Sequence, residues 1–446
     1  MKARLVIPQS LEAGLRAQLM AAAPLEHGAA LLLGLGKVDG GVALFVRKVL
    51  PIPPDGFRIQ EAQRWAPSTT WLSSLVGMAD EANGGVALVH SHPMTSSARR
   101  SAADNWADEL IAPYFLANLG ERPFASLVLT DAEIGGSVWV GGGEHVIEEV
   151  RVPGAVLRRD RAATKPPVDH LHDRHVLLFG EDGQRRLSAL STAVVGAGGT
   201  GSAVAEQLVR MGVGRVMLID PDNLEESNVS RVYGSRREDV GTAKVDVVGR
   251  FLEGIGSGTR IVRVPGDVRR RTIAEQVVRS ADLIFGCTDT HSSRAVLNDI
   301  AYQHMIPTLD VGIRVGMGES GPTSAAVEMR VLRPDLPCLW CYDVLDGRRV
   351  SEELMPVERR AALEREGYVQ GRQPAATIIP YTTLAASLAT SRFLAMCTGL
   401  SEFETGTFVF DALTFDGWQA KASTSGCVCL ERQGLGDARP VWLLDD

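Results

Sequence analysis

A glycine-rich turn between two short apolar segments constrains the fold more than any other feature of this chain. The apolar stretch that begins at Ala193 runs into the sequence Gly-Ala-Gly-Gly-Thr-Gly at residues 196–201. A helix is predicted from Ser202 to Met211, and a second strand from Arg215 to Asp220. This strand–helix–strand unit predicts a mainly parallel, Rossmann-like sheet with helices on both faces. Further strands of the same sheet are predicted at Arg260–Val264, Leu283–Phe285 and Thr308–Val311.

Length and composition indicate a globular protein of two or three domains. The chain has 446 residues, of which 45% are hydrophobic and 22% charged, and this balance excludes a disordered or fibrous protein. The net charge of −8 gives no reason to expect a nucleic-acid partner. The longest uncharged apolar stretch, residues 375–391, contains Pro380 and several threonines and serines, so we expect no membrane span. The N-terminus lacks the apolar core of a signal peptide, and we expect a cytoplasmic protein.

The pattern of the sequence changes at residues 151–173. This stretch is charged, contains prolines and has no sustained apolar period, so we interpret it as a linker between domains at residues 1–150 and 174–446. The first domain has an α+β pattern. Helices are predicted at Ser10–Ala22 and Ser68–Asn83, each opening with a serine in the N-cap position. Its predicted strands are Ala29–Leu33, Val42–Val46, Val86–Val89, Ser126–Leu129 and Val138–Val140.

Two histidines at the end of a predicted strand mark the first candidate site. Alternate residues of a strand point the same way, so His90 and His92 project from one face. Asp104 opens a predicted helix and is a candidate third metal ligand, and Glu26, just before an apolar strand, is a candidate general base. Three ligands with a fourth position open to water are typical of a catalytic zinc site. The alternative interpretation is a solvated strand end without metal.

Together, the glutamate and the HSHP and SAAD sequences resemble the JAMM motif of the JAB/MPN metalloprotease family. The resemblance covers the predicted first domain. It implies a JAB/MPN-like fold and zinc-dependent hydrolysis of peptide or isopeptide bonds after the C-terminus of ubiquitin-like proteins. By position in the motif, His90, His92 and Asp104 would bind zinc, Glu26 would activate the water, and Ser101 would help to stabilise the oxyanion.

Charged residues after the glycine-rich turn suit a nucleoside triphosphate. The glycines allow phosphate to approach backbone amides at a helix N-terminus, and Asp220 is placed to accept hydrogen bonds from a ribose. The glycines and Asp220 alone fit a dinucleotide-dependent enzyme equally well. Asn228, Arg231 and Lys244 follow, and Asp289 lies at the end of another predicted strand. Cations offset phosphate charge and an aspartate can hold Mg²⁺, whereas hydride transfer has no need of this set.

The succession GAGGTG, LIDPD, NVSR, GTAK and CTDT resembles the E1-like superfamily, which includes the ThiF and MoeB adenylyltransferases. The resemblance runs from about Arg174 to Cys429. It implies a homodimer that uses ATP and Mg²⁺ to adenylate the C-terminal glycine of a ubiquitin-like or sulfur-carrier protein, with Arg174 reaching into the ATP site of the partner subunit. By position, the phosphate turn would contain Gly196, Gly198, Gly199 and Gly201, the nucleotide contacts would be Asp220, Asn228, Arg231 and Lys244, and the Mg²⁺ ligand would be Asp289.

The six cysteines all lie after residue 286, and four of them form two close pairs. Cys338 with Cys341, and Cys427 with Cys429, predict a closed structural zinc site of four thiolates. The resemblance places a nucleophilic cysteine of ubiquitin-type E1 enzymes after the first pair, but residues 342–380 contain none, and the matching region reads GYVQGRQP. We therefore expect a chain that stops at the adenylate or passes the acyl group to a thiol elsewhere. A thioester on Cys287 or Cys397 is the less favoured alternative.

The leading interpretation is a bifunctional fusion that processes a ubiquitin-like protein at its C-terminus and activates the exposed glycine, in a conjugation or defence pathway. An E2-like protein or a sulfur donor would then accept the acyl group. Three alternatives stay open. The protein could activate a sulfur carrier for cofactor or metabolite synthesis, it could be a non-catalytic JAB adaptor fused to an E1, or it could be an NAD-dependent dehydrogenase.

Overall fold

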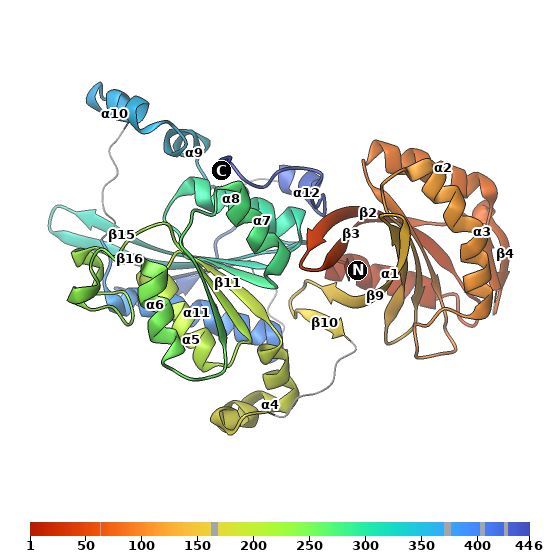
Figure 1. Cartoon of the computed structure of the whole chain (residues 1–446), viewed down its shortest axis with the longest axis horizontal. Helices are drawn as coiled ribbons and strands as arrows, with labels where there is room; N and C mark the ends of the chain where they lie inside the picture. Colours follow the sequence, from red (N-terminus) through yellow and green to blue (C-terminus); the bar gives the residue numbers. More distant parts are fainter. Residues whose placement is uncertain (63, 162–167, 370–375, 402–405, 423–426) are drawn as a thin grey trace. The chain divides into compact units, whose positions relative to one another are not determined.

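The chain divides into two compact units. The computed structural model describes residues 1–62, 64–161, 168–369, 376–401, 406–422 and 427–446. Unit 1 consists of Met1–Thr164, Gln303–Met305 and Arg432–Pro440, and unit 2 consists of Lys165–Tyr302, Ile306–Glu431 and Val441–Asp446 (Figure 1). Among the helices of the described residues, none is long and apolar enough to cross a bilayer.

The main sheet of unit 1 closes on itself. Its strands follow the order β1-β3-β2-β6-β7-β8-β9-β10, and β1 pairs with β9 as well as with β3, so the sheet forms a closed barrel with β10 attached to β9. The pairs β1–β3, β1–β9 and β6–β7 are parallel and the others antiparallel. The strands are β1 (Lys2–Val6), β2 (Gly28–Val38), β3 (Gly41–Pro51), β6 (Gly85–Ser91), β7 (Phe124–Leu129), β8 (Ile134–Val140), β9 (Gly143–Val152) and β10 (Arg158–Arg161).

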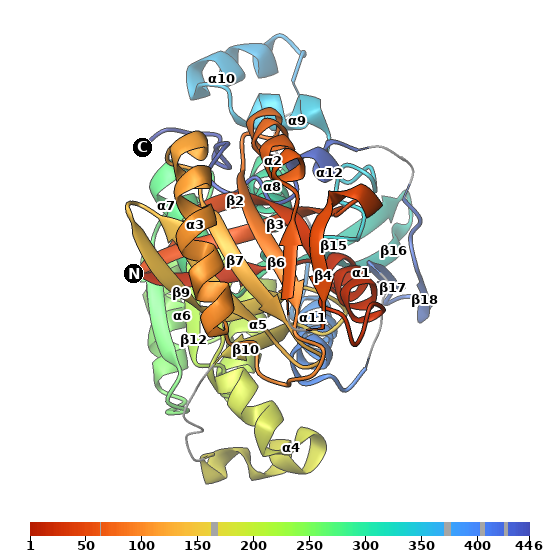
Figure 2. The ribbon, with the colours of Figure 1, turned by 90° about the vertical axis from the view of Figure 1, so that its right-hand side faces the viewer.

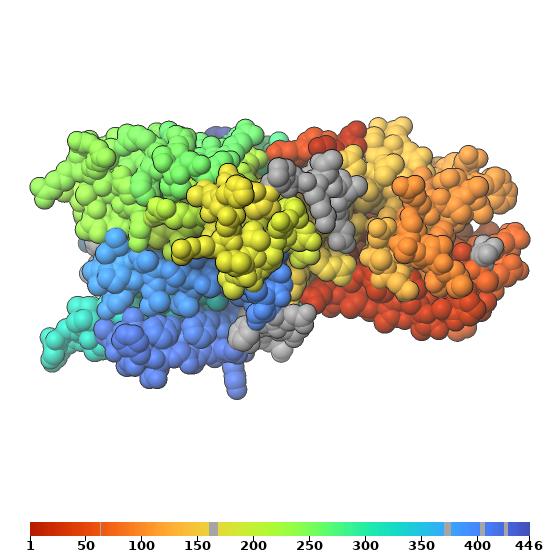
Figure 3. All heavy atoms as spheres, turned by 90° about the horizontal axis from the view of Figure 1, so that it is seen from below, coloured from red at the N-terminus to blue at the C-terminus, as the bar shows by residue number. Residues whose placement is uncertain are grey.

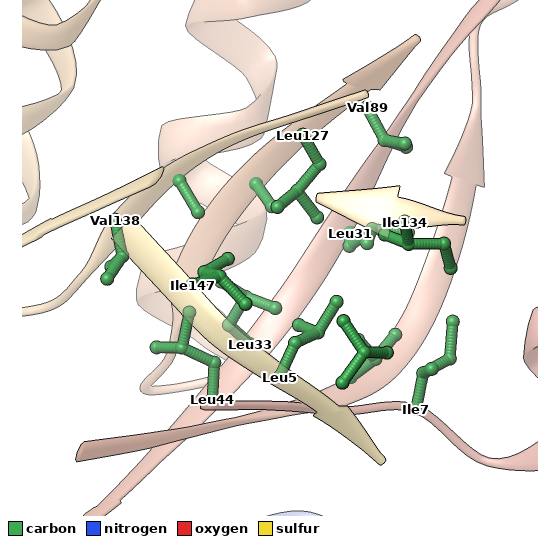
Figure 4. Close-up of a cluster of buried hydrophobic side chains, with 14 of the residues drawn as sticks. Leu5, Ile7, Leu31, Leu33, Leu44, Val89, Leu127, Ile134, Val138 and Ile147 are labelled. Carbon is green, nitrogen blue, oxygen red and sulfur yellow. The ribbon is translucent and has the colours of Figure 1, made fainter. Parts of the chain in front are cut away.

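Strand alternation separates two apolar faces of this barrel. Leu31 and Leu33 of β2 belong to a cluster that also contains Val89 of β6, and Figure 4 shows these side chains in the space enclosed by the strands. Ala30 and Leu32 alternate with them and pack on the outer face instead. Two helices cover that outer face, so it too is buried. Because both faces of these strands are buried, successive residues are apolar, and the strands have continuous apolar sequences.

Among the described residues of unit 1, α-helices and a hairpin accompany the barrel. The helices are α1 (Gln9–Met20), α2 (Thr69–Glu81) and α3 (Ala102–Leu119), and α2 and α3 supply Leu75 and Phe115 to the outer cluster (Figure 2). Ser68 caps α2 as predicted, since its Oγ accepts a hydrogen bond from the backbone N–H of Trp71. The predicted serine cap of the first helix is wrong, because α1 begins one residue earlier and follows Pro8. Strands β4 (Phe57–Glu61) and β5 (Arg64–Pro67) form a separate two-stranded sheet.

Unit 2 contains a mixed sheet whose glycine-rich turn lies where the strand order reverses. The order is β13-β12-β11-β14-β15-β16-β17-β18, parallel from β13 to β15 and antiparallel from β15 to β18. The prediction of a mainly parallel sheet therefore holds for the half that contains the turn. The strands are β11 (Ser191–Val195), β12 (Arg215–Ile219), β13 (Arg260–Val264), β14 (Leu283–Gly286), β15 (Thr308–Gly318), β16 (Gly321–Leu332), β17 (Thr407–Asp411) and β18 (Asp416–Trp418).

The strand order reverses around β11, and the carboxyl ends of the strands at such a reversal are the usual place for a ligand in an open α/β sheet. Helix α5 follows β11 and α8 follows β14. The helices of unit 2 are α4 (Asp173–Ser188), α5 (Gly199–Arg210), α6 (Lys244–Glu253), α7 (Arg271–Ser280), α8 (His291–Gln303), α9 (Gly347–Glu353), α10 (Val357–Arg365), α11 (Ile379–Thr398) and α12 (Val428–Arg432).

Candidate functional sites

The histidines of unit 1 project from the outer face of the barrel, on the side covered by α2 and α3. Val86 and Leu88 of β6 belong to the outer cluster, so His90, two residues further along, lies on the same face. Gly28 of β2 pairs with His90 in register, and Glu26 lies two residues before it. Asp104 stands in the first turn of α3. Strand alternation and one helix start therefore bring all four predicted residues to one place.

The donor atoms of this cluster converge. The Nε2 atoms of His90 and His92 are 3.1 Å apart, and they lie 3.1 Å and 3.3 Å from the two carboxylate oxygens of Asp104. Glu26 Oε1 is 3.8 Å from His92 Nε2. Glu26, His90 and His92 are each exposed by less than a tenth, and a ligand atom from each lies within 4.8 Å of the others, close enough to share one ion. The donor set of imidazoles and carboxylates suits zinc.

The electrostatics of the cluster separate the roles of its two carboxylates. Hydrogen bonds from His90 and His92 hold the pKa of Asp104 well below its usual range, although burial acts in the opposite direction. Burial raises the pKa of Glu26, and the nearby imidazoles only partly offset this effect. A carboxylate that stays ionised is suited to ligation, and a carboxylate with a raised pKa is suited to proton transfer.

Ser101 occupies the N-cap of α3 in this structure. Its Oγ accepts a hydrogen bond of 3.2 Å from the backbone N–H of Asp104, and its own N–H donates to Asp104 Oδ2 at 2.6 Å. This reciprocal capping box fixes the orientation of the Asp104 carboxylate. The oxyanion role of Ser101 stays a prediction.

The glycine-rich turn of unit 2 depends on the absence of side chains at two positions. Gly196 has a φ of +98°, and a Cβ there would lie 2.5 Å from the carbonyl oxygen of Cys287. A Cβ on Gly201 would lie 1.7 Å from the carbonyl oxygen of Gly196. Gly198 has open space around it, and Gly199 is the first residue of α5. The turn therefore presents bare backbone at a helix N-terminus, which is an arrangement suited to phosphate.

Asp220 lies just beyond β12, next to this turn. Its Oδ2 accepts a hydrogen bond of 2.7 Å from the N–H of Ala197, and its Oδ1 accepts one of 2.9 Å from the N–H of Asp222. Lys244, the first residue of α6, places its Nζ 2.8 Å from Asp222 Oδ2 and 3.9 Å from Asp220 Oδ1. Burial raises the pKa of Asp220, and the Lys244 ammonium opposes that shift. The structure thus brings the predicted aspartate and lysine together at the turn.

Other predicted nucleotide residues lie on loops around the same end of the sheet. The stem of Arg231 lies against α5, since a Cβ on Gly199 would approach its Cγ to 3.1 Å, and its Nη1 donates to the carbonyl oxygen of Ser227. Asn228 is buried and accepts a hydrogen bond from the N–H of Glu225. Asp289 is exposed in the segment between β14 and α8. Contacts of these side chains with a nucleotide stay predictions.

Arg174 lies in the first turn of α4. It is exposed, as are Leu177 and Leu178 on the same helix, whose relative exposures are 88% and 62%. Helix α4 is drawn in yellow at the surface in Figure 3. A kink at Phe179 and Gly180 divides the helix. An exposed arginine beside exposed leucines is consistent with a segment that packs on another chain.

The four paired cysteines form one cluster in unit 2. Cys338 Sγ lies 3.7 Å from Cys341 Sγ and 3.4 Å from Cys427 Sγ, and the ligand atoms of these three and of Cys429 all lie within 4.8 Å of one another. This geometry fits a tetrahedral thiolate site for zinc. Cys397 is buried in α11, and burial raises the pKa of the Cys287 and Cys397 thiols, which disfavours the nucleophilic thiolate. Of the GYVQGRQP stretch at residues 367–374, which lacks the nucleophilic cysteine, residues 370–374 lie outside those described.

Replacing Cys341 by serine should remove about one zinc equivalent per chain and lower the free energy of unfolding of unit 2 by about 2–4 kcal/mol, because a structural ion contributes folding energy. Inductively coupled plasma mass spectrometry and urea unfolding measure the two effects. Cys287→Ala is the matched control and should keep the zinc content. An unchanged zinc content in Cys341→Ser would show that the four thiols are unmetallated.

Two residues close to the candidate sites were not anticipated. Asp222 pairs with Lys244, and its place in the LIDPD sequence two residues after Asp220 could have indicated this. The indole of Trp65 lies over the imidazole of His90, with ring centroids 5.4 Å apart. No local pattern predicts this contact, because β5 and β6 belong to different sheets.

A glycine turn at the reversal point of a parallel sheet, with a buried aspartate and a lysine beside it, gives unit 2 an arrangement that is typical of nucleotide-binding α/β domains. Residues 172–429 match the ThiF family, and because this stretch exceeds half of the chain, the protein belongs to that family.

Similarity to individual proteins is partial. The chain is 30% identical over 172 residues to the SAMP-activating enzyme E1 of Haloferax volcanii, a match that covers 38% of this chain and 60% of that protein. It is 35% identical over 139 residues to the sulfur carrier protein adenylyltransferase of Thermus thermophilus, covering 31% of this chain and 51% of that protein. A structure of E. coli MccB with MccA-N7isoASN aligns with a TM-score of 0.48 at 19% identity, covering 59% of this chain and 75% of that chain. The chain thus spans between half and three-fifths of the length of these two curated relatives.

Proposed function

We propose that unit 2 adenylates the C-terminal glycine of a ubiquitin-like or sulfur-carrier protein. The observation that carries this proposal is the bare glycine turn with Asp220 and Lys244 beside it, in a chain of the ThiF family. The names of the two curated relatives specify activation of SAMP and adenylylation of a sulfur carrier protein. Sulfur-carrier activation therefore stands first among the partners, ahead of a conjugation or defence pathway.

The chemistry needs positioning and charge neutralisation rather than a protein nucleophile. The C-terminal carboxylate of the partner attacks the α-phosphorus of ATP, an acyl-adenylate forms, and pyrophosphate leaves. Backbone N–H groups at the start of α5 hold phosphate oxygens, while Lys244 and Arg231 offset the negative charge that pyrophosphate carries away. Asp289 would hold Mg²⁺, which supplies further neutralisation of the phosphates.

The acyl-adenylate is then passed to a partner rather than to a cysteine of this chain. The stretch that follows the first cysteine pair contains no cysteine as far as residue 380, and the thiols of Cys287 and Cys397 have raised pKa values. A sulfur donor is the acceptor that suits sulfur-carrier activation, and an E2-like thiol is the alternative. The chain would work as a homodimer, with Arg174 and the exposed leucines of α4 supporting a contact with the second copy.

Intact mass spectrometry tests the adenylation. A small modifier with a β-grasp fold and a C-terminal Gly-Gly, incubated with this protein and ATP·Mg²⁺, should gain the mass of an AMP adduct. A truncated modifier without the last glycine is the matched control and should stay unchanged. A modifier that binds the protein but gains no adduct, together with the absence of pyrophosphate release, would contradict the proposed activity.

A second candidate activity, zinc-dependent hydrolysis at the C-terminus of the same class of partner, is favoured by the convergence of Glu26, His90, His92 and Asp104. His90, His92 and Asp104 would hold a zinc ion, which would supply Lewis-acid activation of water and of the scissile carbonyl. Glu26, whose pKa is raised by burial, takes the proton of the water and returns it to the leaving amine. The JAB/MPN assignment of unit 1 rests on this residue set.

The hydrolysis has its own test. A modifier that carries a short peptide after its Gly-Gly should lose that peptide in the presence of the wild-type protein, and His90→Ala should abolish the loss while leaving AMP transfer intact. Unchanged processing in His90→Ala would contradict the proposed zinc mechanism. No processing by a zinc-loaded wild-type chain would leave unit 1 with a binding role as an adaptor.

A further inference from the structure

We infer that the β4–β5 hairpin positions the metal centre of unit 1, and that Trp65 fixes the direction in which His90 presents its Nε2. This inference rests on the second candidate activity above, which supplies the zinc. The hairpin is not part of the barrel sheet. It nevertheless contacts both the strand that carries His90 and the segment that carries Glu26.

The indole of Trp65 covers one face of the His90 imidazole. The ring centroids are 5.4 Å apart and the planes are tilted by 30°. Rotation of an imidazole about its χ2 is soft, so packing on the face of the ring decides where Nε2 points. Because His90 Nε2 lies 3.1 Å from both His92 Nε2 and Asp104 Oδ1, a rotation that displaces it would separate the donors that share an ion.

Gly28 is the reason that the indole can lie there. It is the register partner of His90 in the β2–β6 pair. A Cβ on Gly28 would lie 2.5 Å from Cζ3 and 2.7 Å from Cε3 of Trp65, so any larger residue would displace the ring. The backbone of β2 at Gly28 and the imidazole of His90 on β6 thus form a surface against which the indole of Trp65 packs.

Two more contacts join the hairpin to the segment around the proposed base. The N–H of Glu26 donates to the carbonyl oxygen of Glu61 at 2.9 Å, and Phe57 packs edge-on against His27 with ring centroids 5.0 Å apart. Both β4 and β6 are visible in Figure 2. One hairpin therefore holds the backbone at Glu26 and the ring of His90, which are the general base and a ligand of the proposed reaction.

Zinc affinity tests this role without reference to catalysis. The zinc ion of unit 1 is identified in the full-length chain as the one that is lost in His90→Ala. Competition against a chromophoric chelator gives its dissociation constant. Trp65→Ala and Gly28→Ala should each weaken it about tenfold or more, since residues that orient metal ligands commonly contribute 10- to 100-fold to affinity. Trp65→Phe, which keeps an aromatic face, should restore most of that loss.

Trp139→Ala is the matched control. Trp139 is also a partly buried tryptophan packed against the outer cluster, but it stacks on Phe124 rather than on a histidine. It should keep wild-type zinc affinity. The positioning role of Trp65 would be overturned if Trp65→Ala kept the wild-type zinc affinity, or if Trp139→Ala lost as much affinity as Trp65→Ala. Neither result would contradict the hydrolase proposal. A wild-type chain without any His90-dependent zinc would overturn the hydrolase proposal and this inference together.

Discussion

Gly201→Ala should unfold unit 2 or destabilise it by about 5 kcal/mol, at the upper end of what single substitutions do. The added Cβ would lie 1.7 Å from the carbonyl oxygen of Gly196 and 2.8 Å from its carbonyl carbon. Both atoms belong to the backbone, so no side-chain rotation can relieve the overlap. The start of α5 would have to move away from β11, which is buried between β12 and β14. Urea unfolding followed by circular dichroism measures the loss, and isothermal titration with ATP should show no binding.

Gly198→Ala is the matched control for this prediction. Gly198 lies in the same turn, its φ of −74° is allowed for any residue, and nothing lies within 4 Å of the position of a Cβ. Its unfolding midpoint should stay within the range of an ordinary surface substitution. Equal midpoints for both variants would mean that the close approach of α5 to the turn does not exist in solution.

Asp289→Ala should reduce ATP–pyrophosphate exchange about 100- to 1,000-fold, because one preorganised charge at the reacting phosphates commonly contributes that much. Asp289 follows β14 at the reversal point of the sheet, two residues before α8 begins, and would be a ligand of the Mg²⁺. Exchange assays over a range of Mg²⁺ concentrations should also show a higher Mg²⁺ requirement in the variant.

Asp416→Ala removes another exposed carboxylate, from the edge strand β18, and should exchange pyrophosphate at the wild-type rate. If Asp289→Ala retained wild-type exchange at every Mg²⁺ concentration, the metal would have to be held by other residues of unit 2.

Local patterns predicted the elements that position both sites. The apolar run before the glycine turn predicted β11, and the spacing to Asp220 predicted β12. Strand alternation correctly placed His90 and His92 on one face, because the period of a strand is two whatever surrounds it. The two cysteine pairs predicted a cluster that the structure brings together across 89 residues of sequence.

Closure of the barrel was not predicted, for a physical reason. Strands β1 and β9 are far apart in the sequence, and β9 mixes charged with apolar residues and buries Glu149 and Arg151, so it does not stand out as an apolar run. Their pairing depends on the accumulated twist and tilt of all the strands between them rather than on either sequence. The contact of Trp65 with His90 escaped prediction for the same reason, since it joins two separate sheets.

The division of the chain into units has a practical consequence for anyone who wishes to express them apart. Unit 1 includes Arg432–Pro440, more than 260 positions after its main body ends at Thr164. Within unit 1, the N–H of Lys37 donates to Asp437 Oδ2, and Gly34 leaves room for the backbone of Gly434. A gene divided once, after the codon for Thr164, would give a unit 1 that lacks Arg432–Pro440. Separate production of an intact barrel would call for a tethered copy of that terminal segment, or for a circular permutation that joins it to the N-terminus.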